Sequence, residues 1–272
     1  GSPQKHKDVK SMPSIRILTW NSTGESFPKA ASLAAEAATH AAHATHPVID
    51  IYLIQEAQQG AGGAISNYLT GLAGYTVHHI HENLGGGGKG YICATRNASV
   101  TVSTPLALWN YAADPGFMAW AGHTALQASS WTPPARTPAY SLLQVGGSNI
   151  LLITWHAPLG VSLLPIIVGS MSGGALIDAY LALDQSGLLN NPMLAIGVVP
   201  DFIVIAGDMN AKPAALGKSY AGYTPLDNFT GVANNLDHIM ATSPPHTAFN
   251  FSEDYSTATA STHDILCARM NW

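Results

Sequence analysis

The sequence predicts an α/β protein in which two β-sheets pack face to face with helices outside them, a four-layer αββα sandwich. Eight short runs rich in apolar and β-branched residues support this prediction, because their lengths suit buried strands. Most of these runs are apolar at nearly every position, which indicates that both faces of each strand are covered. The runs span residues 15–20, 49–55, 90–95, 140–145, 150–156, 202–206, 236–241 and 265–270.

Two segments favour helices by composition and length. The first is an Ala-rich segment at residues 30–46, and the second covers residues 174–185. No internal repeat and no linker rich in Pro, Ser or Gly divides the chain, so we expect one catalytic domain over residues 14–272. Residues 1–13 have the character of an expression-tag scar followed by a disordered lead-in.

The composition limits what the chain can bind through charge alone. Only 10% of the 272 residues are charged, the formal net charge is −5, and Lys and Arg together number 11. We therefore expect no strong, non-specific grip on nucleic acid from this chain by itself. Two cysteines, Cys93 and Cys267, allow at most one intramolecular disulfide and leave the redox compartment open.

A membrane span has to be considered, because no charged residue occurs between Arg136 and Asp178. Pro158 and Pro165 interrupt this stretch. Its apolar run over residues 159–168 is also much shorter than the roughly 20 residues that a spanning helix needs. We therefore expect no transmembrane segment.

Polar signatures stand at the ends of the apolar runs, where a rigid scaffold can direct side chains into one cleft. Each signature is weak alone, because a Glu after a strand or a Gly-Asp-x-Asn turn occurs in proteins of every function. Together they indicate one catalytic site. The signatures are Thr19-Trp20-Asn21, Gln55-Glu56-Ala57, Trp155-His156-Ala157-Pro158, Gly207-Asp208-Met209-Asn210, Leu236-Asp237-His238-Ile239 and Ser261-Thr262-His263-Asp264.

Taken in order, the signatures supply Asn, Glu, His, Asp-x-Asn, Asp and His, which resembles the ordered motifs of the endonuclease/exonuclease/phosphatase superfamily. The resemblance covers residues 15–270. It implies a DNase I-like fold with two mostly antiparallel sheets, and hydrolysis of phosphate esters with a divalent metal ion. Within the superfamily, the motifs look most like those of the cytolethal distending toxin B subunit and of DNase I. His156 matters most for that choice, since abasic-site endonucleases tend to carry a Tyr-containing motif in its place.

The resemblance implies a metal site at Glu56 and Asn21, with Mg²⁺, or Mn²⁺ or Ca²⁺, as the ion. Hard divalent cations take oxygen ligands and keep waters, so one or two carboxylates plus the substrate phosphate suffice. The family expects an Asp where Thr262 stands, so a metal-side residue that is usually acidic is a hydroxyl here. Asp264 lies two residues further, about 6.6 Å along an extended strand, which is too far to replace that carboxylate directly.

The resemblance also implies the groups that perform the reaction. Asp208 and Asn210 would surround the attacking water and the scissile phosphate. Asp237 would orient His263, because a carboxylate holds an imidazole in one orientation and keeps it basic. His156 would be the second histidine, and the assignment of acid and base between the two histidines stays open.

Arg136 looks like the family's phosphate-binding arginine, because a planar guanidinium can bind two phosphate oxygens at once. Asn210 and Asn21 would contact the same phosphate. A separate phosphate-binding loop at residues 85–88 is not expected, because Lys89 is followed by Gly rather than by Ser or Thr and then by a strand-like run. We interpret that glycine-rich segment as a hairpin turn.

These features favour an endonuclease that nicks DNA, a toxin or effector that is secreted or delivered into its target. A delivery or targeting subunit would then supply the positive surface that this chain lacks. The alternative is a phosphoinositide phosphatase or a sphingomyelinase-like phosphodiesterase acting on a phospholipid headgroup, which the low basic content favours. A third reading, a non-catalytic binding module, rests on Thr262 alone.

Overall fold

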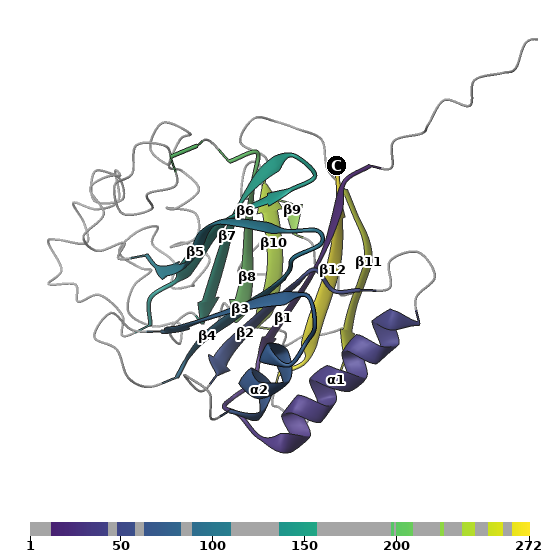
Figure 1. The fold of residues 1–272 in the computed structure, drawn as a ribbon, viewed down its shortest axis with the longest axis vertical. Coiled ribbons are helices and arrows are strands. Elements are labelled where there is room, and N and C mark those ends of the chain that lie inside the picture. The colour runs from purple at the N-terminus through teal and green to yellow at the C-terminus, as the bar shows by residue number, and fades with distance from the viewer. Residues whose placement is uncertain are drawn as a thin grey trace, which may run out of the picture.

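The computed structural model describes residues 12–42, 48–57, 63–82, 89–109, 136–156, 197–198, 200–208, 224–225, 236–242, 250–257 and 263–272. Within these residues the chain forms two six-stranded sheets and two helices (Figure 1). The sheets pack face to face, and this confirms the predicted two-sheet sandwich.

The first sheet has the strand order β11-β12-β1-β2-β4-β3. β1 and β2 are parallel, and every other neighbouring pair in this sheet is antiparallel. Its strands are β1 (Ser14–Asn21), β2 (Ile51–Ala57), β3 (Tyr75–His81), β4 (Gly90–Arg96), β11 (Asn250–Thr257) and β12 (Ile265–Asn271).

The second sheet repeats this pattern with the order β5-β6-β7-β8-β10-β9. β7 and β8 are parallel, and their neighbours are antiparallel. Each sheet therefore has one parallel pair at its centre. The strands are β5 (Thr101–Leu108), β6 (Ala139–Val145), β7 (Ser148–His156), β8 (Phe202–Asp208), β9 (Thr224–Pro225) and β10 (Asp237–Thr242).

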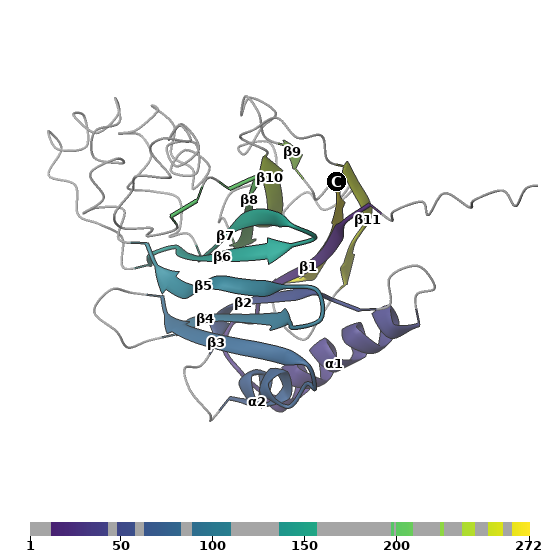
Figure 2. The same cartoon turned by 45° about the horizontal axis from the view of Figure 1, so that its top comes forward.

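Helices α1 (Phe27–Ala41) and α2 (Ala64–Thr70) lie together on the outer face of the first sheet (Figures 1 and 2). β1 contributes Ile15 and Ile17 to an apolar cluster shared with strands of the second sheet. It contributes Leu18 and Trp20 to a second cluster, shared with the two helices. β1 is thus covered on both faces, and each such side chain stabilises the fold by roughly 1.5–3 kcal/mol. The helix predicted at residues 174–185 lies outside the described residues.

Helix α1 begins and ends earlier than its Ala-rich composition predicts, at Phe27 and Ala41. Pro28 lies in the first turn, where its missing N–H costs nothing and its fixed φ suits a helix. The Ser26 carbonyl accepts the first helical hydrogen bond from Ala30 N–H at 3.1 Å. The helix therefore begins at Phe27, between a serine and a proline that precede the Ala-rich run.

The strands that the apolar pattern does not predict are β3, β5, β9 and β11, and all of them lie at sheet edges. An edge strand is covered less completely than a central one, so its sequence needs fewer apolar residues. β3 accordingly contains His78, His79 and His81, and β5 contains Pro105. The eight predicted runs correspond to the interior strands of the two sheets.

Cys93 and Cys267 are both buried, and neither forms a disulfide. They belong to the two different apolar clusters, on opposite faces of the first sheet, so no disulfide joins them. Neither α1 nor α2 is long and apolar enough to cross a membrane.

Candidate active site

The predicted functional side chains lie at one end of the sandwich, where β1, β2, β7 and β8 end and β10 and β12 begin. β7 ends at His156, β8 ends at Asp208, and β10 begins at Asp237. His156 pairs with Asp208, and Asp208 pairs with Asp237, so these residues form one row across neighbouring strands. In the first sheet, Asn21 is the last residue of β1 and Glu56 lies near the end of β2.

Gly207 makes this row possible. It pairs with Trp155 of β7, and a Cβ at this position would lie 2.1 Å from the Trp155 carbonyl oxygen. Its φ of +147° is also one that residues with a side chain rarely adopt. The glycine of the Gly-Asp-x-Asn signature thus lets β8 approach β7 closely just before Asp208.

Asn21 connects two carboxylates of the site. Its Nδ2 donates to Asp208 Oδ2 at 2.8 Å and to Glu56 Oε1 at 3.3 Å. Its Oδ1 accepts a hydrogen bond from the Thr23 backbone N–H at 2.9 Å. In this orientation the amide nitrogen faces the site, so Asn21 positions carboxylates rather than offering an oxygen to a metal ion.

Glu56 is directed into the site by an irregularity in β2. The pairing of β2 with β4 shifts register between Ile54 and Ala57, and Glu56 adopts a φ of +56°. Its Oε2 contacts the Lys89 ammonium. Burial alone raises the pKa of Glu56, but the hydrogen bond from Lys89 and the nearby His156 reverse that effect and lower it. Glu56 is therefore an anion in this site.

Gln55 supports the site from inside the sandwich. It is fully buried, and its Nε2 donates to Thr19 Oγ1 of β1 and to Thr154 Oγ1 of β7, both at 3.0 Å. The side chain therefore connects the two sheets directly beneath the site residues. A buried amide needs such partners, because an unsatisfied one costs about 1–3 kcal/mol.

His156 is buried, and its ring nitrogens face Glu82, Arg136, Glu56 and Asp208. Its Nδ1 lies 3.1 Å from Glu82 Oε2, and its Nε2 lies 2.6 Å from Arg136 Nη1 and 3.3 Å from Glu56 Oε1. A guanidinium can only donate, so Nε2 accepts from Arg136 and the ring proton lies on Nδ1, facing Glu82. In this arrangement Nδ1 faces Glu82, and Nε2 is the ring nitrogen that faces Arg136 and the other site carboxylates.

The backbone around His156 is held by a chain of hydrogen bonds. The His156 N–H donates to the Tyr91 hydroxyl at 3.2 Å, and that hydroxyl donates to the Thr137 carbonyl at 2.9 Å. The Thr137 N–H in turn donates to the Glu82 carbonyl at 2.6 Å. The chain thereby fixes Glu82 and Arg136 relative to the imidazole.

His263 forms the second imidazole–carboxylate pair. Its Nδ1 lies 2.6 Å from Asp237 Oδ2, and its Nε2 lies 3.8 Å from Asp208 Oδ2. Its backbone carbonyl accepts a hydrogen bond from Trp20 Nε1 at 3.1 Å. Burial alone lowers the pKa of His263, but the hydrogen bond and charge of Asp237, with a contribution from Asp208, raise it above its ordinary value. His263 therefore retains its proton more strongly than a free histidine does.

No protein-family model matches the chain, and no curated protein sequence matches it either. Solved structures match over nearly the whole chain. D. rerio TDP2 complexed with a single-strand DNA product has a TM-score of 0.60 at 14% identity, covering 95% of this chain and 99% of that one. The human Nocturnin catalytic domain with a bound sulfate anion has a TM-score of 0.60 at 14% identity, with coverages of 95% and 93%. An endonuclease/exonuclease/phosphatase family protein from Bacteroides thetaiotaomicron has a TM-score of 0.56 at 13% identity, with 96% of both chains covered.

The chain has the DNase I-like fold of the endonuclease/exonuclease/phosphatase superfamily. The fold that the ordered motifs predict is therefore confirmed. In this DNase I-like sandwich, the described motif residues Asn21, Glu56, His156, Asp208, Asp237 and His263 are brought together in one site.

A group of three side chains and one separate carboxylate in this site could hold a divalent cation. Ligand atoms of Asp208, Asp237 and His263 all lie within 4.8 Å of one another. Asp237 and His263 are hydrogen bonded to each other, and the other candidate ligand is Glu56. Glu56 already binds a cation, the Lys89 ammonium, so its chemistry fits a metal ion.

Three of the predicted site residues are not part of these contacts. Asn210 and Thr262 lie outside the described residues, so their roles at the phosphate and the metal stay predictions. Asp264 is half-buried, directly precedes β12 and is not a member of the group formed by Asp208, Asp237 and His263.

Two site residues were not predicted from the sequence, Glu82 and Lys89. Glu82 directly follows β3 and Lys89 directly precedes β4. The Glu82 N–H donates to the Lys89 carbonyl at 3.1 Å. The antiparallel pairing of β3 with β4 confirms the hairpin interpretation. In the sequence, Glu82 and Lys89 are only one acidic and one basic residue flanking a glycine-rich segment, which does not distinguish them from solvated charges.

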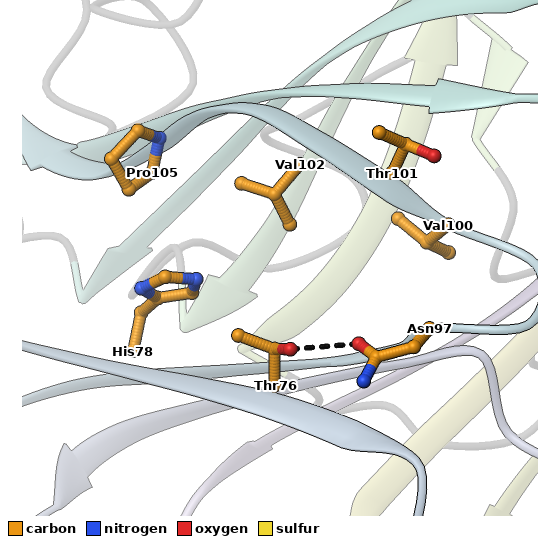
Figure 3. Close-up of a pocket in the computed structure, with 7 residues that line it drawn as sticks. All are labelled: Thr76, His78, Asn97, Val100, Thr101, Val102 and Pro105. Carbon is orange, nitrogen blue, oxygen red and sulfur yellow. Dashed lines mark hydrogen bonds between the residues drawn. The ribbon is translucent and has the colours of Figure 1, made fainter.

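A separate cavity of about 520 Å³ lies between the edge strands β3 and β5 (Figure 3). Figure 3 shows His78 directed from β3 toward Val102 and Pro105 of β5. None of the predicted site residues lines this cavity. Its lining consists of Thr76, His78, Asn97, Val100, Thr101, Val102 and Pro105.

Proposed function

We propose that the chain is a divalent-metal-dependent phosphodiesterase that acts on DNA as an endonuclease. The observation that carries this proposal is the pair of imidazole–carboxylate contacts facing each other across Asp208. Nε2 of His156 and Nε2 of His263 lie 3.7 Å and 3.8 Å from the same oxygen, Asp208 Oδ2. Phosphodiester hydrolysis needs one group that removes a proton from water and another that protonates the leaving oxygen.

The contacts of the two histidines favour His156 as the base and His263 as the acid. Nδ1 of His156 faces Glu82 and its Nε2 accepts from Arg136, so in the proposed reaction Nε2 takes the proton of the attacking water once Arg136 turns to the phosphate. The water oxygen bonds to phosphorus as the P–O bond to the leaving group breaks, and the leaving oxygen takes the proton of His263 Nε2. Asp237 and Glu82 hold the two rings in place and stabilise the positive charge that each carries during the cycle.

Glu56 and Asn21 complete the proposed site. A divalent ion bound at Glu56 would neutralise charge on the phosphate oxygens. Asn21 keeps the Glu56 and Asp208 carboxylates at fixed positions through its amide nitrogen. Arg136 is placed beside His156 and can bind a phosphate oxygen there.

DNA is proposed as the substrate for two reasons. The motifs resemble those of DNase I and the cytolethal distending toxin B subunit, and D. rerio TDP2, a structural neighbour, was complexed with single-strand DNA product. The same resemblance supports a secreted or delivered toxin or effector with a separate delivery subunit. The alternative is a phosphatase or sphingomyelinase-like activity on lipid-linked phosphate, which is favoured by 11 basic against 16 acidic residues.

The test is nicking of supercoiled plasmid by the purified chain with Mg²⁺, with EDTA as the metal-free control. His156→Ala and His263→Ala should each lower turnover at least about 100-fold while the circular dichroism spectrum is retained, because each removes a proton-transfer group. Phosphate release from phosphoinositides, or phosphocholine release from sphingomyelin, without nicking would select the lipid alternative. Less than about tenfold loss in both variants would contradict the proposed roles of the histidines.

A further inference from the structure

Lys89 binds the carboxylate that is the proposed metal ligand. Its Nζ contacts Glu56 Oε2, while Glu56 Oε1 accepts a hydrogen bond from Asn21 at 3.3 Å. The Lys89 side chain is 47% exposed and that of Glu56 is 13% exposed, so the lysine approaches the carboxylate from the solvent side. Each oxygen of Glu56 therefore has a donor, and the outer one is bound to a cation.

Both partners of this ion pair are held by regular structure. Lys89 directly precedes β4, and its carbonyl accepts the hydrogen bond from Glu82 that closes the base of the β3–β4 hairpin. β4 pairs with β2, and Ala57 lies opposite Gly90, so Glu56 and Lys89 flank this residue pair diagonally. The pairing of β2 with β4 therefore brings the two backbones close enough for the Lys89 side chain to reach Glu56.

A second lysine shows that this contact is specific to Lys89. Lys29 is close enough that the charges of Lys89 and Glu56 both affect its pKa. However, its ammonium donates to Thr23 O at 3.0 Å, Thr23 Oγ1 at 3.1 Å and Gly24 O at 3.2 Å. The Lys29 ammonium is thus hydrogen bonded to the segment between β1 and α1, whereas the Lys89 ammonium contacts the proposed metal-binding carboxylate.

We propose that Lys89 is an internal counter-cation: it occupies Glu56 in the metal-free protein and is displaced when a divalent metal ion binds there. An ammonium and a divalent cation repel each other and cannot both contact Oε2, so metal binding requires the lysine to move away. The energy of the Lys89–Glu56 contact is then subtracted from the metal affinity. Lys89 therefore sets the metal concentration at which the site fills. This inference rests on the proposed metal dependence.

The experiment is calorimetric titration of the full chain with Mg²⁺ in the absence of nucleic acid, comparing the wild type with Lys89→Met. Removing the ammonium should tighten Mg²⁺ binding on the order of tenfold, because a charge close to a divalent cation is lost. Lys89→Arg retains the positive charge and should bind Mg²⁺ within about threefold of the wild type. Lys29→Met is the matched control, since it removes one nearby charge without releasing Glu56, and it should tighten binding by less than about threefold.

Each outcome decides the proposal. Tightening in Lys89→Met, and not in the two control variants, supports displacement of Lys89 by the metal. If the wild type binds Mg²⁺ and Lys89→Met binds it equally well or more weakly, the inference is overturned while metal dependence stays intact. Equal tightening in Lys29→Met also overturns it, because the effect would then come from net charge rather than from the contact. No heat of Mg²⁺ binding in either the wild type or Lys89→Met would overturn both this inference and the proposed metal dependence.

Discussion

At the scale of single residues, the two histidines of the site have different partners. His156 Nε2 lies 2.6 Å from the Arg136 guanidinium, a group that only donates hydrogen bonds. His263 faces the carboxylates of Asp237 at 2.6 Å and Asp208 at 3.8 Å, which favour the charged ring. Two imidazoles on one sandwich can therefore serve as base and acid at the same pH.

The raised pKa of His263 predicts a specific response to Asp237→Asn. That substitution removes the negative charge and weakens the hydrogen bond, so the pKa of His263 should fall toward or below about 6.5, the ordinary histidine value. NMR titration of the metal-free protein measures it. Since the proposed acid must be protonated, turnover should decline as the pH rises through the pKa of His263, and this decline should occur at lower pH in Asp237→Asn.

The raised pKa of His263 also determines the pH range over which this histidine stabilises the fold. A raised folded-state pKa stabilises the fold fully below about pH 6.5, and the contribution disappears as the pH rises through the folded value. Asp201→Asn is the control, because Asp201 binds the Asn149 N–H at 2.8 Å, at the opposite end of β7 and β8. A His263 pKa that is the same in the wild type and Asp237→Asn would contradict the assigned cause.

Site residues at the ends of predicted strands could be identified from the sequence. Glu82 and Lys89, which flank the glycine-rich segment, could not. Asn21, His156 and Asp208 each follow an apolar run, so the run itself marks them. Glu82 and Lys89 adjoin an edge strand and a glycine-rich turn, and only the pairing of β3 with β4 brings them to the site. Nothing local in the sequence distinguishes them from solvated charges.

At the scale of secondary-structure elements, burial decided which strands the sequence revealed. Interior strands of both sheets are apolar on two faces and were predicted, whereas β3, β5, β9 and β11 are edges and were not. Helix α2 was missed for a related reason: it is short, and its first N–H groups are capped from outside. The Glu25 carboxylate accepts from Ile65 N–H at 2.8 Å and from Ser66 N–H at 3.2 Å. A cap supplied by the β1–α1 loop leaves no signature beside the helix.

The close approach of β7 and β8 predicts that Gly207→Ala is severely destabilising. The new Cβ would collide with the Trp155 carbonyl, so we expect the free energy of unfolding to fall by at least about 3 kcal/mol, measured by urea denaturation. Gly147→Ala is the matched control, because Gly147 has φ +88° and nothing within 4 Å of the added Cβ. It should cost only about 1–2 kcal/mol. Equal losses in the two variants would show that backbone conformation, and not the collision, requires the glycine at 207.

At the scale of the whole molecule, the site exists only because two separately paired sheets meet in a fixed register. Asn21 of the first sheet must reach Asp208 of the second, and Glu56 must reach His156. Apolar packing between the sheets is strong but does not fix their relative position by itself, because apolar contacts are non-directional. A directional contact between the sheets is supplied by Gln55, whose amide nitrogen donates to Thr154 of β7.

This contact predicts an energetic coupling between the sheets. Thr154→Val keeps the shape of the side chain but removes the acceptor, so it should lower the free energy of unfolding by about 1–2 kcal/mol. Gln55→Met removes the donor, and in the double variant the loss at Thr154 should be smaller by about 1 kcal/mol, since no amide is left unsatisfied. Thr154→Ser retains the hydroxyl and should preserve the coupling. Urea denaturation of the four proteins of the cycle measures it, and additive losses would mean that the hydrogen bond contributes nothing across the sandwich.

Because Gln55 precedes Glu56 and Thr154 lies two residues before His156, Thr154→Val should also lower kcat more than it changes KM. A change confined to KM would place the effect of Thr154 on substrate binding instead of on the alignment of the two sheets.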